Sequence, residues 1–323
     1  MTTAAAAKTA SSGPIPVWID TDPAVGETHR DVDDGLALLQ AFHSPELALR
    51  GVSVVFGNTS LEQALPIARD IVTRFGPPGL TVEPGASGPN QVGVETAASG
   101  AMAEALRREP LTILALGPMS NVATVLRNHP ELARRIVRVV AVAGRRPGQC
   151  FTTGCHNTCG HRDFNFEQDP DAFSILLASD VPLALAPFEL ASQVWITSRD
   201  LDRLEAASDA GRWIAPAART WLQLWMETFG VDGFNPFDTL AVAYVTTPQF
   251  VAVESLAVEI QVLSDDGTER RMQGTAVPEK PYLLVSSGRD ALARHVEYCH
   301  KALAPLKEDI LRRVAGRALA RRR

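Results

Sequence analysis

The chain has 323 residues, of which 46% are hydrophobic and 21% charged, a balance typical of a globular protein with a substantial core. Its formal net charge of −6 argues against nucleic acid or an anionic membrane as the main partner. No apolar run is long enough to span a membrane.

The two ends of the chain differ from its middle. Residues 1–13 are small and polar and lack the apolar core of a signal peptide, so we expect a disordered tail. Residues 316–323 are expected to form a solvated basic tail, and residues 14–315 a single catalytic domain. Four cysteines are too few for a secreted disulfide scaffold, which favours a reducing, cytoplasmic location.

Runs typical of β-strands alternate with helical patterns along most of the chain. The predicted strands are 17–20, 49–56, 80–82, 111–116, 136–143 and 183–186. The predicted helices include 35–42, 60–75, 101–108, 121–127, 169–179 and 215–229. This alternation predicts an α/β fold with a mainly parallel central sheet and helices on both faces. Beyond residue 252 we expect a hairpin of 257–263 and 272–277, a strand at 281–286 and a final helix from Asp290.

Polar residues follow several of these strands. Asp20 and Asp22 end the first strand, and Asn58 follows the second. Residues 117–121 follow the fourth, and a loop rich in Gly, Cys, His and Asn follows the fifth. Ligands of doubly wound sheets bind outside the carboxyl ends of the strands, so we expect the site there.

Five aspartates fall within fifteen residues: Asp20, Asp22, Asp31, Asp33 and Asp34. Each of the last three could simply begin the following helix, because aspartate favours helix N-termini. Carboxylates from a strand end facing carboxylates from a helix start would instead form an all-oxygen cage suited to Ca²⁺ or Mg²⁺. A bound cation would also relieve the repulsion between the like charges.

Five motifs occur in a fixed order over about residues 17–245. They are Asp20-Thr21-Asp22-Pro23 with the later Asp33-Asp34-Gly35-Leu36-Ala37-Leu38, Phe56-Gly57-Asn58, Leu116 to Asn121, Asn157 with Asp163, Asn165 and Asp169-Pro170, and Phe237-Asp238-Thr239-Leu240-Ala241. The ordered set resembles the inosine–uridine-preferring nucleoside hydrolases, which are calcium-dependent N-ribohydrolases.

The resemblance implies the nucleoside hydrolase fold and hydrolysis of a ribonucleoside to ribose and a free base, as in nucleoside salvage. It implies Ca²⁺ held by Asp22, Asp34, Asp238 and the carbonyl of Ser120, with Asp22 also acting as general base. It places Asp33, Asn58, Asn157, Asp163 and Asn165 on the sugar. It also implies a homodimer or homotetramer.

The sequence departs from the family pattern in the segment between Asp22 and Asp33, which is longer and carries Glu27, His29, Arg30 and Asp31. This insert is either an inert bulge or a loop over the ribose 5′ end. In the second case His29 and Arg30 would favour an anionic or enlarged substituent. Asp31 could also replace one of the expected metal ligands.

Two further departures affect the substrate. Phe237 stands where the family has a histidine associated with protonating the leaving base, and it cannot donate a proton. Trp221, Trp225 and Phe229 share one helical face and could stack against the base, or they could be plain core. Asp163 replaces a glutamate and is one methylene shorter.

The loop around Asp163 is also unusual. It holds Cys150, Cys155, His156, Cys159 and His161, enough ligands for zinc, but at a spacing that is not a standard zinc pattern. Contact of His156, His161 or Arg162 with the substrate is the alternative.

Two other functions remain open from the sequence. One is a non-catalytic ribose- or nucleoside-binding relative, because Phe237 and Asp163 both weaken the catalytic pattern. The other is a Mg²⁺-dependent phosphohydrolase with Asp20 as nucleophile, although Ala24 stands where that motif needs a threonine or valine.

Overall fold

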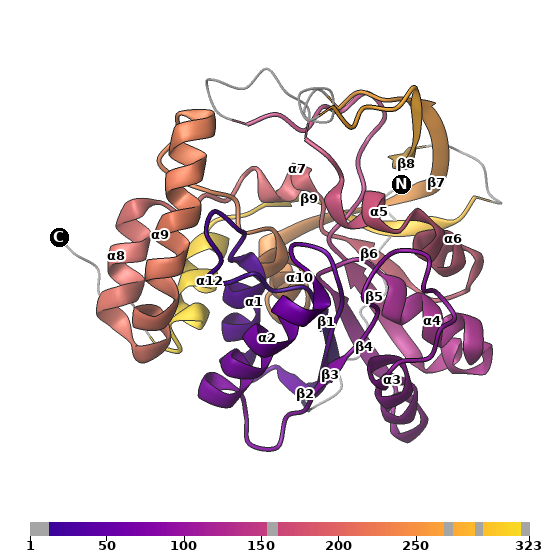
Figure 1. The fold of residues 1–323 in the computed structure, drawn as a ribbon, viewed down its shortest axis with the longest axis horizontal. Coiled ribbons are helices and arrows are strands. Elements are labelled where there is room, and N and C mark those ends of the chain that lie inside the picture. The colour runs from indigo at the N-terminus through magenta and orange to yellow at the C-terminus, as the bar shows by residue number, and fades with distance from the viewer. Residues whose placement is uncertain (1–12, 154–160, 268–273, 288–292, 318–323) are drawn as a thin grey trace, which may run out of the picture.

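The computed structural model describes residues 13–153, 161–267, 274–287 and 293–317. A nine-stranded sheet runs through it in the order β3-β2-β1-β4-β5-β6-β9-β7-β8 (Figure 1). The strands are β1 (Ile15–Thr21), β2 (Leu47–Val54), β3 (Val82–Pro84), β4 (Leu111–Ala115), β5 (Ile136–Ala141), β6 (Leu183–Leu185), β7 (Val251–Ser264), β8 (Glu279–Ser286) and β9 (His295–Ala302).

The sheet is parallel except where β7 joins it. Strand β1 is parallel to both β2 and β4, and β6 is parallel to both β5 and β9. Strand β7 is antiparallel to β8 and β9. The chain builds β1 to β3 toward one edge and β4 to β6 toward the other, so the strand order reverses between β1 and β4. A reversal of this kind leaves a crevice at the carboxyl ends of the two strands.

Helices cover both faces of the sheet (Figure 1). They are α1 (Asp33–Phe42), α2 (Leu61–Phe75), α3 (Ala97–Arg108), α4 (Ser120–Asn128), α5 (Phe164–Gln168), α6 (Pro170–Ala178), α7 (Phe188–Ala191), α8 (Ser198–Ala207), α9 (Asp209–Phe229), α10 (Phe237–Thr246) and α12 (Leu306–Val314), with 3₁₀ turns at Pro130–Arg135 and Pro248–Phe250. Side chains of α1, α8, α9, α10 and α12 form one core, and those of α3, α4 and α6 the other. Val17 and Ile19 face the first core and Trp18 the second, as the alternation of a strand requires.

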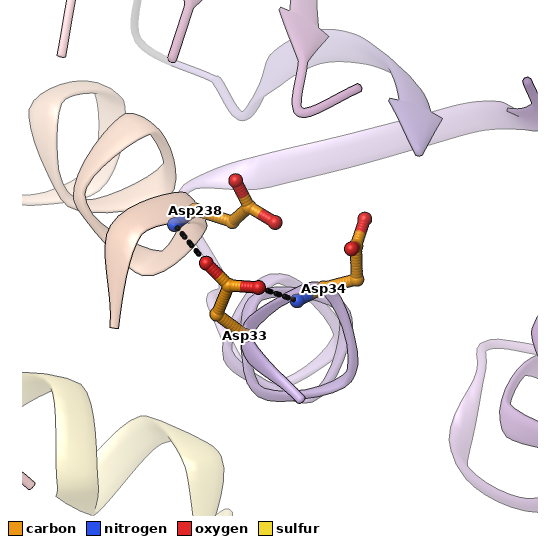
Figure 2. Close-up of side chains that lie close together, drawn as sticks. All are labelled: Asp33, Asp34 and Asp238. Atoms are coloured by element: carbon orange, nitrogen blue, oxygen red, sulfur yellow. Dashed lines mark hydrogen bonds between the residues drawn. The ribbon is translucent and has the colours of Figure 1, made fainter. Parts of the chain in front are cut away.

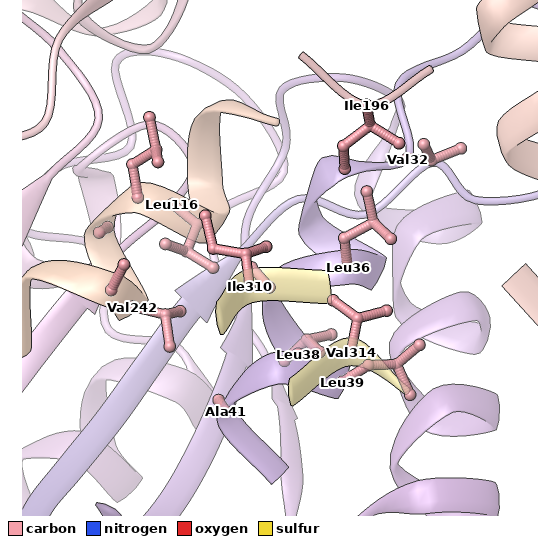
Figure 3. Close-up of a cluster of buried hydrophobic side chains, with 14 of the residues drawn as sticks. Val32, Leu36, Leu38, Leu39, Ala41, Leu116, Ile196, Val242, Ile310 and Val314 are labelled. Atoms are coloured by element: carbon pink, nitrogen blue, oxygen red, sulfur yellow. The ribbon is translucent and has the colours of Figure 1, made fainter. Parts of the chain in front are cut away.

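Helix α1 carries the aspartate cluster into the interior. Its residues from Asp33 to Ala41 are all buried. Leu36 and Leu39 belong to the same cluster of buried side chains as Val242 of α10 and Val314 of α12 (Figure 3). A helix surrounded in this way is buried on all sides, so the carboxylates at its first turn are carried inward with it.

The predicted α/β fold is confirmed, and the expected strands up to residue 186 lie within two residues of the observed ones. The C-terminal prediction was wrong in two respects. Strand β7 pairs with β8 at Glu279–Ser286, and residues 274–278 belong to no strand. Strand β9 at His295–Ala302 lies where the final helix was expected, and that helix begins at Leu306. Because β9 pairs with β6 and β7, contacts remote in sequence define it.

The predicted tails lie almost entirely outside the described residues, as do Cys155, His156, Asn157 and Cys159. Among the described residues, no helix combines the length and the apolar character needed to cross a membrane.

Candidate active site

Three carboxylates meet beside the reversal in strand order. Asp33 and Asp34 begin α1, and Asp238 lies in the first turn of α10. One ligand atom from each of the three lies within 4.8 Å of the other two (Figure 2). The two oxygens of Asp33 accept hydrogen bonds from the backbone N–H groups of Asp34 at 3.1 Å and Asp238 at 3.3 Å. This group, the acidic floor, joins two helix starts into one cluster of oxygen donors.

Asp22 lies between two glycine-containing loops next to the floor. One oxygen, Oδ2, accepts the N–H of Asn58 at 2.6 Å, and the Asp22 N–H donates to Asp34 at 3.0 Å. A Cβ on Gly57 would lie 1.9 Å from Asp22 Oδ2, and a Cβ on Gly117 would lie 2.7 Å from Oδ1. The glycines of two sequence motifs are therefore required by the close approach of this carboxylate.

Asp20 supports the site from behind. Its side chain is fully buried and accepts hydrogen bonds from Ser53 at 2.6 Å and Asn121 at 2.8 Å. Burial, its largest influence, raises the pKa of Asp20 to about 7 against the opposing effect of these bonds. A carboxylate enclosed in this way is not placed to attack a phosphate, so Asp20 gives no support to the phosphohydrolase alternative.

The carboxylates of the site disfavour one another's ionisation. Burial raises the pKa values of Asp22, Asp33 and Asp238 well above the usual range, and the negative charges of neighbouring aspartates raise them further. Burial also raises the pKa of Asp34 to about 6, while hydrogen bonds from Thr21 and Asp22 act in the opposite direction. The cluster is thus short of positive charge.

A cavity of about 870 Å³ opens above the floor. Eight predicted site residues line it: Asp33, Asn58, Asp163, Asn165, Trp225, Phe229, Phe237 and Asp238. Asp22, Asp34 and Ser120 do not line it. Asn58 connects the cavity to Asp34, because its side-chain amide donates a hydrogen bond to the Asp34 carboxylate at 3.1 Å. Asn157 falls outside the part of the chain that the structure describes.

Helix α9 supplies an aromatic wall to this cavity. The rings of Trp221, Trp225 and Phe229 follow one another edge to face, at 6.1 and 5.2 Å between centroids. Trp225 is only 4% exposed, so it belongs to the core and also lines the cavity. His161 stands edge-on against Phe229 with 5.1 Å between ring centroids. The wall therefore combines flat apolar faces with one titratable side chain.

The loop before α5 is tied firmly to the sheet. Asp163 accepts the Gly144 N–H at 2.7 Å and donates its own N–H to Glu167 at 3.1 Å. Glu167 in turn pairs with Lys280 of β8 at 2.6 Å. Burial raises the pKa of Asp163 to about 7. Asp163, which replaces the expected glutamate and is shorter, thus accepts a hydrogen bond from the backbone that follows β5.

Two other residues singled out from the sequence make local hydrogen bonds, and their expected metal-binding roles stay predictions. The carbonyl of Ser120 accepts the Thr124 hydroxyl at 2.8 Å within α4, whereas Leu116 lines the cavity. Asp31 also lines the cavity, but its carboxylate accepts the N–H groups of Val32 at 2.6 Å and Asp33 at 3.0 Å. Asp31 thus hydrogen-bonds the backbone that enters α1, whose N-cap residue is Val32.

Sequence reasoning missed some lining residues. Phe151 and Phe188 line the cavity with stacked rings whose centroids lie 4.8 Å apart. Phe188 follows β6, so its position after a strand end was a usable signal. Phe151 offered none, because it lies in an irregular segment.

The sequence model of the inosine-uridine preferring nucleoside hydrolases matches residues 17–281. The chain belongs to this family. Membership confirms the predicted enzyme class, a hydrolase of N-glycosyl compounds. It also sets aside the phosphohydrolase alternative, because the match runs through both halves of the acidic floor.

The chain is also similar in sequence to bacterial proteins named as ribonucleoside hydrolases. The pyrimidine-specific ribonucleoside hydrolase RihA of Enterobacter sp. (strain 638) is 29% identical over 76% of this chain and 84% of the relative. The protein of the same name from Klebsiella pneumoniae (strain 342) is 28% identical over 74% of this chain and 82% of its own length.

Solved structures share the fold. A plant nucleoside hydrolase covers 94% of this chain and 99% of its own, with a TM-score of 0.77 at 19% identity. A purine-preferring ribonucleoside hydrolase from Gardnerella vaginalis covers 93% and 98%, with a TM-score of 0.73 at 21% identity. At this identity the likeness concerns the fold.

Proposed function

We propose that this family member hydrolyses the N-glycosidic bond of a ribonucleoside to ribose and a free base, with Ca²⁺ bound at the acidic floor. The observation that carries the proposal is the meeting of Asp33, Asp34 and Asp238 within 4.8 Å at the base of a cavity of about 870 Å³. A cation site that opens onto a pocket with polar and aromatic walls suits a sugar carrying a base.

The residues present fit a hard divalent cation. All side-chain donors are carboxylate oxygens, which Ca²⁺ and Mg²⁺ prefer. Oδ1 of Asp22 is buried and, among the described residues, has no hydrogen-bond partner. Asp34 and Asp238 of the floor and the adjacent Asp22 would hold the ion, with Ser120 remaining a prediction as the source of a carbonyl ligand. When bound, the ion lowers the pKa of a coordinated water and anchors the sugar hydroxyls.

Asp22 acts as the general base. The Asn58 N–H holds Oδ2, which leaves Oδ1 to take a proton from the attacking water. Gly57 and Gly117 confine the carboxylate from both sides, so its orientation is set before the substrate binds.

The sugar and the base bind to different walls. Asp33, Asn58, Asp163 and Asn165 hydrogen-bond the sugar, and Asp33 adds negative charge beside the cationic sugar of the transition state. Trp225, Phe229 and Phe237 contact the base. Departure of the base needs a proton that Phe237 cannot give. His161, which packs against Phe229, donates it.

The test is chromatography of products from a panel of purine and pyrimidine ribonucleosides, with Ca²⁺ and with excess chelator. We expect release of a free base that the chelator abolishes, and its loss in Asp22→Asn. Asp70→Asn, on the exposed side of α2, serves as the matched control and should keep full activity. Calcium-dependent thermal stabilisation by a nucleoside without any base release would instead favour the non-catalytic binding protein. Homo-oligomerisation and a cytoplasmic location remain predictions.

A further inference from the structure

Four basic side chains, which we call the basic rim, line the same cavity as the acidic floor. They are His29, Arg30, His161 and Arg162. His29 and Arg30 belong to the insert between β1 and α1 and are exposed, whereas residues 161 and 162 precede α5. The hydrolysis of a neutral nucleoside proposed above uses neither arginine.

Both arginines of the rim lack an acidic partner within the described segments of the chain. The Arg162 Nε is buried there without a hydrogen-bond acceptor, and its guanidinium lies 5.2 Å from the centroid of the Phe164 ring. Arg145, which is buried as a whole residue, is instead held by Asp266 at 2.8 Å. Burying a cationic donor without an acceptor is costly, so a site of this kind is suited to an anionic ligand.

The geometry of a ribose connects the rim to the floor. The two hydroxyls at C2′ and C3′ lie on one edge of the ring, and the base and the 5′ carbon lie on either side of the ring oxygen. With the hydroxyl edge on the floor, both substituents point toward the mouth of the cavity. The base occupies the wall formed by Trp225 and Phe229, which leaves the 5′ group for the side of Asp163 and its neighbour Arg162.

We propose that the two arginines of the basic rim, Arg162 and Arg30, bind a phosphate on the 5′ end of the substrate, and that the enzyme therefore acts on ribonucleoside 5′-monophosphates. The inference rests on the proposed N-ribohydrolase function and specifies its substrate class. Guanidinium groups bind phosphate through paired, charge-assisted hydrogen bonds. Arg162 is the principal contact, and Arg30, on the exposed insert, closes over the phosphate from the other segment.

The reaction is balanced without any further reactant. The bond between C1′ and the base nitrogen breaks, and its electron pair leaves with the base. The water oxygen joins C1′, one of its protons passes to Asp22, and the base receives a proton from His161. The products are ribose 5-phosphate and the free base, and nothing is oxidised or reduced.

The experiment compares kcat/KM for three substrates on the full chain with saturating Ca²⁺: a ribonucleoside, its 5′-monophosphate, and a ribonucleoside with a carboxylate on the base. We expect the 5′-monophosphate to exceed the parent nucleoside by about tenfold or more, because a charge-assisted pair contributes at least that factor. Arg162→Gln should lower this ratio by about tenfold. Arg74→Gln, an exposed arginine paired with Asp70 on α2, is the matched control and should leave the ratio unchanged.

The outcomes separate this inference from the function on which it rests. Turnover of the nucleoside with an equal or smaller kcat/KM for its 5′-monophosphate overturns the inference alone. A higher kcat/KM for the nucleoside with a carboxylated base than for the 5′-monophosphate, lost in Arg162→Gln, also overturns the inference, because the rim would then bind the base and not the 5′ group. If no substrate is turned over, the proposed function fails. Calorimetry of ribose 5-phosphate and of ribose then tests phosphate binding by the rim. The inference is supported if ribose 5-phosphate binds more tightly than ribose and Arg162→Gln removes the difference, and it is overturned otherwise.

Discussion

Asp163 illustrates how one buried side chain makes stability depend on pH. Its pKa rises from the ordinary 3.8 to about 7, chiefly because burial disfavours the charged carboxylate. The folded state therefore holds a proton that the unfolded chain releases at lower pH. The stability from this group is fully present below pH 3.8 and is lost as the pH rises toward about 7.

Asp163→Asn should remove this pH dependence, because the amide stays neutral and can still accept the Gly144 N–H. As the pH rises from about 4 to about 7, the free energy of unfolding of the variant minus that of the wild type should increase by at most roughly 1.4 kcal/mol for each pH unit. Above about pH 7 this difference should stay constant. Urea unfolding of both proteins across this range measures it. Parallel curves would show that Asp163 titrates normally.

His161 is the proton donor proposed for the leaving base, so its role should depend on the leaving group. His161→Gln should lower kcat for ribonucleosides by about 10²-fold. It should leave a 4-nitrophenyl riboside unaffected, because that leaving group departs as a stable anion. Adding Phe237→His to the variant should restore part of the nucleoside activity. His129→Gln, outside the cavity, is the control. An equal loss on both substrates would assign His161 to structure instead.

The loops that follow β2 and β4 determine the position of the Asp22 carboxylate. Each places a glycine against one of its oxygens, and each is anchored next to a helix start at Ser60 or Ser120. The short connections leave the backbone little freedom, so the approach of these loops determines where the carboxylate can lie.

Gly57→Ala should displace the Asp22 carboxylate, because the added Cβ would lie 1.9 Å from Oδ2. A shift near 1 Å costs about 10²-fold in rate, so kcat should fall by about that factor while circular dichroism stays native. Gly88→Ala is the matched control, since a Cβ there meets nothing within 4 Å. Full activity in Gly57→Ala would remove Asp22 from the role of positioned base.

At the scale of the whole molecule, the antiparallel end of the sheet supports the site. Lys280 of β8 and Glu167 of α5 are almost completely buried and lie 2.6 Å apart. Glu167 also receives the Asp163 N–H, so this pair links β8 to the cavity wall. Breaking a buried pair costs more than the pair contributes, because the remaining charge stays in the interior.

Lys280→Met should lower the free energy of unfolding by roughly 3–5 kcal/mol and raise KM for the substrate. Replacing both partners, in Lys280→Met/Glu167→Leu, should recover only part of the stability, because Lys280 also lies 3.7 Å from Asp265 and 3.5 Å from Asp266, and both carboxylates lose this cation. It should not recover the KM, because Asp163 loses the acceptor for its N–H. Denaturant unfolding and initial-rate kinetics measure the two effects. Lys301→Met, on the exposed side of β9, controls for loss of a lysine. If Lys280→Met changes the free energy of unfolding only slightly, the prediction is wrong, and solvent must reach Glu167 once the lysine is removed.

The local pattern of the sequence determined much of this protein. The alternation of strand-like and helical runs predicted the α/β fold, because burial of each element repeats with its own period. The polar residues after strands predicted the edge of the sheet that carries the site. Each of these signals lies within a few neighbouring residues.

Only the tertiary structure decided which remote residues meet. Asp33 and Asp238 are 205 positions apart, and α10 brings them into hydrogen-bonding contact. The pair of Lys280 and Glu167 joins segments 113 positions apart, and no local pattern predicts such a partner. Strand β9 was missed for the same reason, since both strands that pair with it lie elsewhere in the chain. The side chains of a segment set a preference for helix or strand, but its neighbours in space follow from packing the whole chain around a common core, and those neighbours can override the preference, as they do at β9.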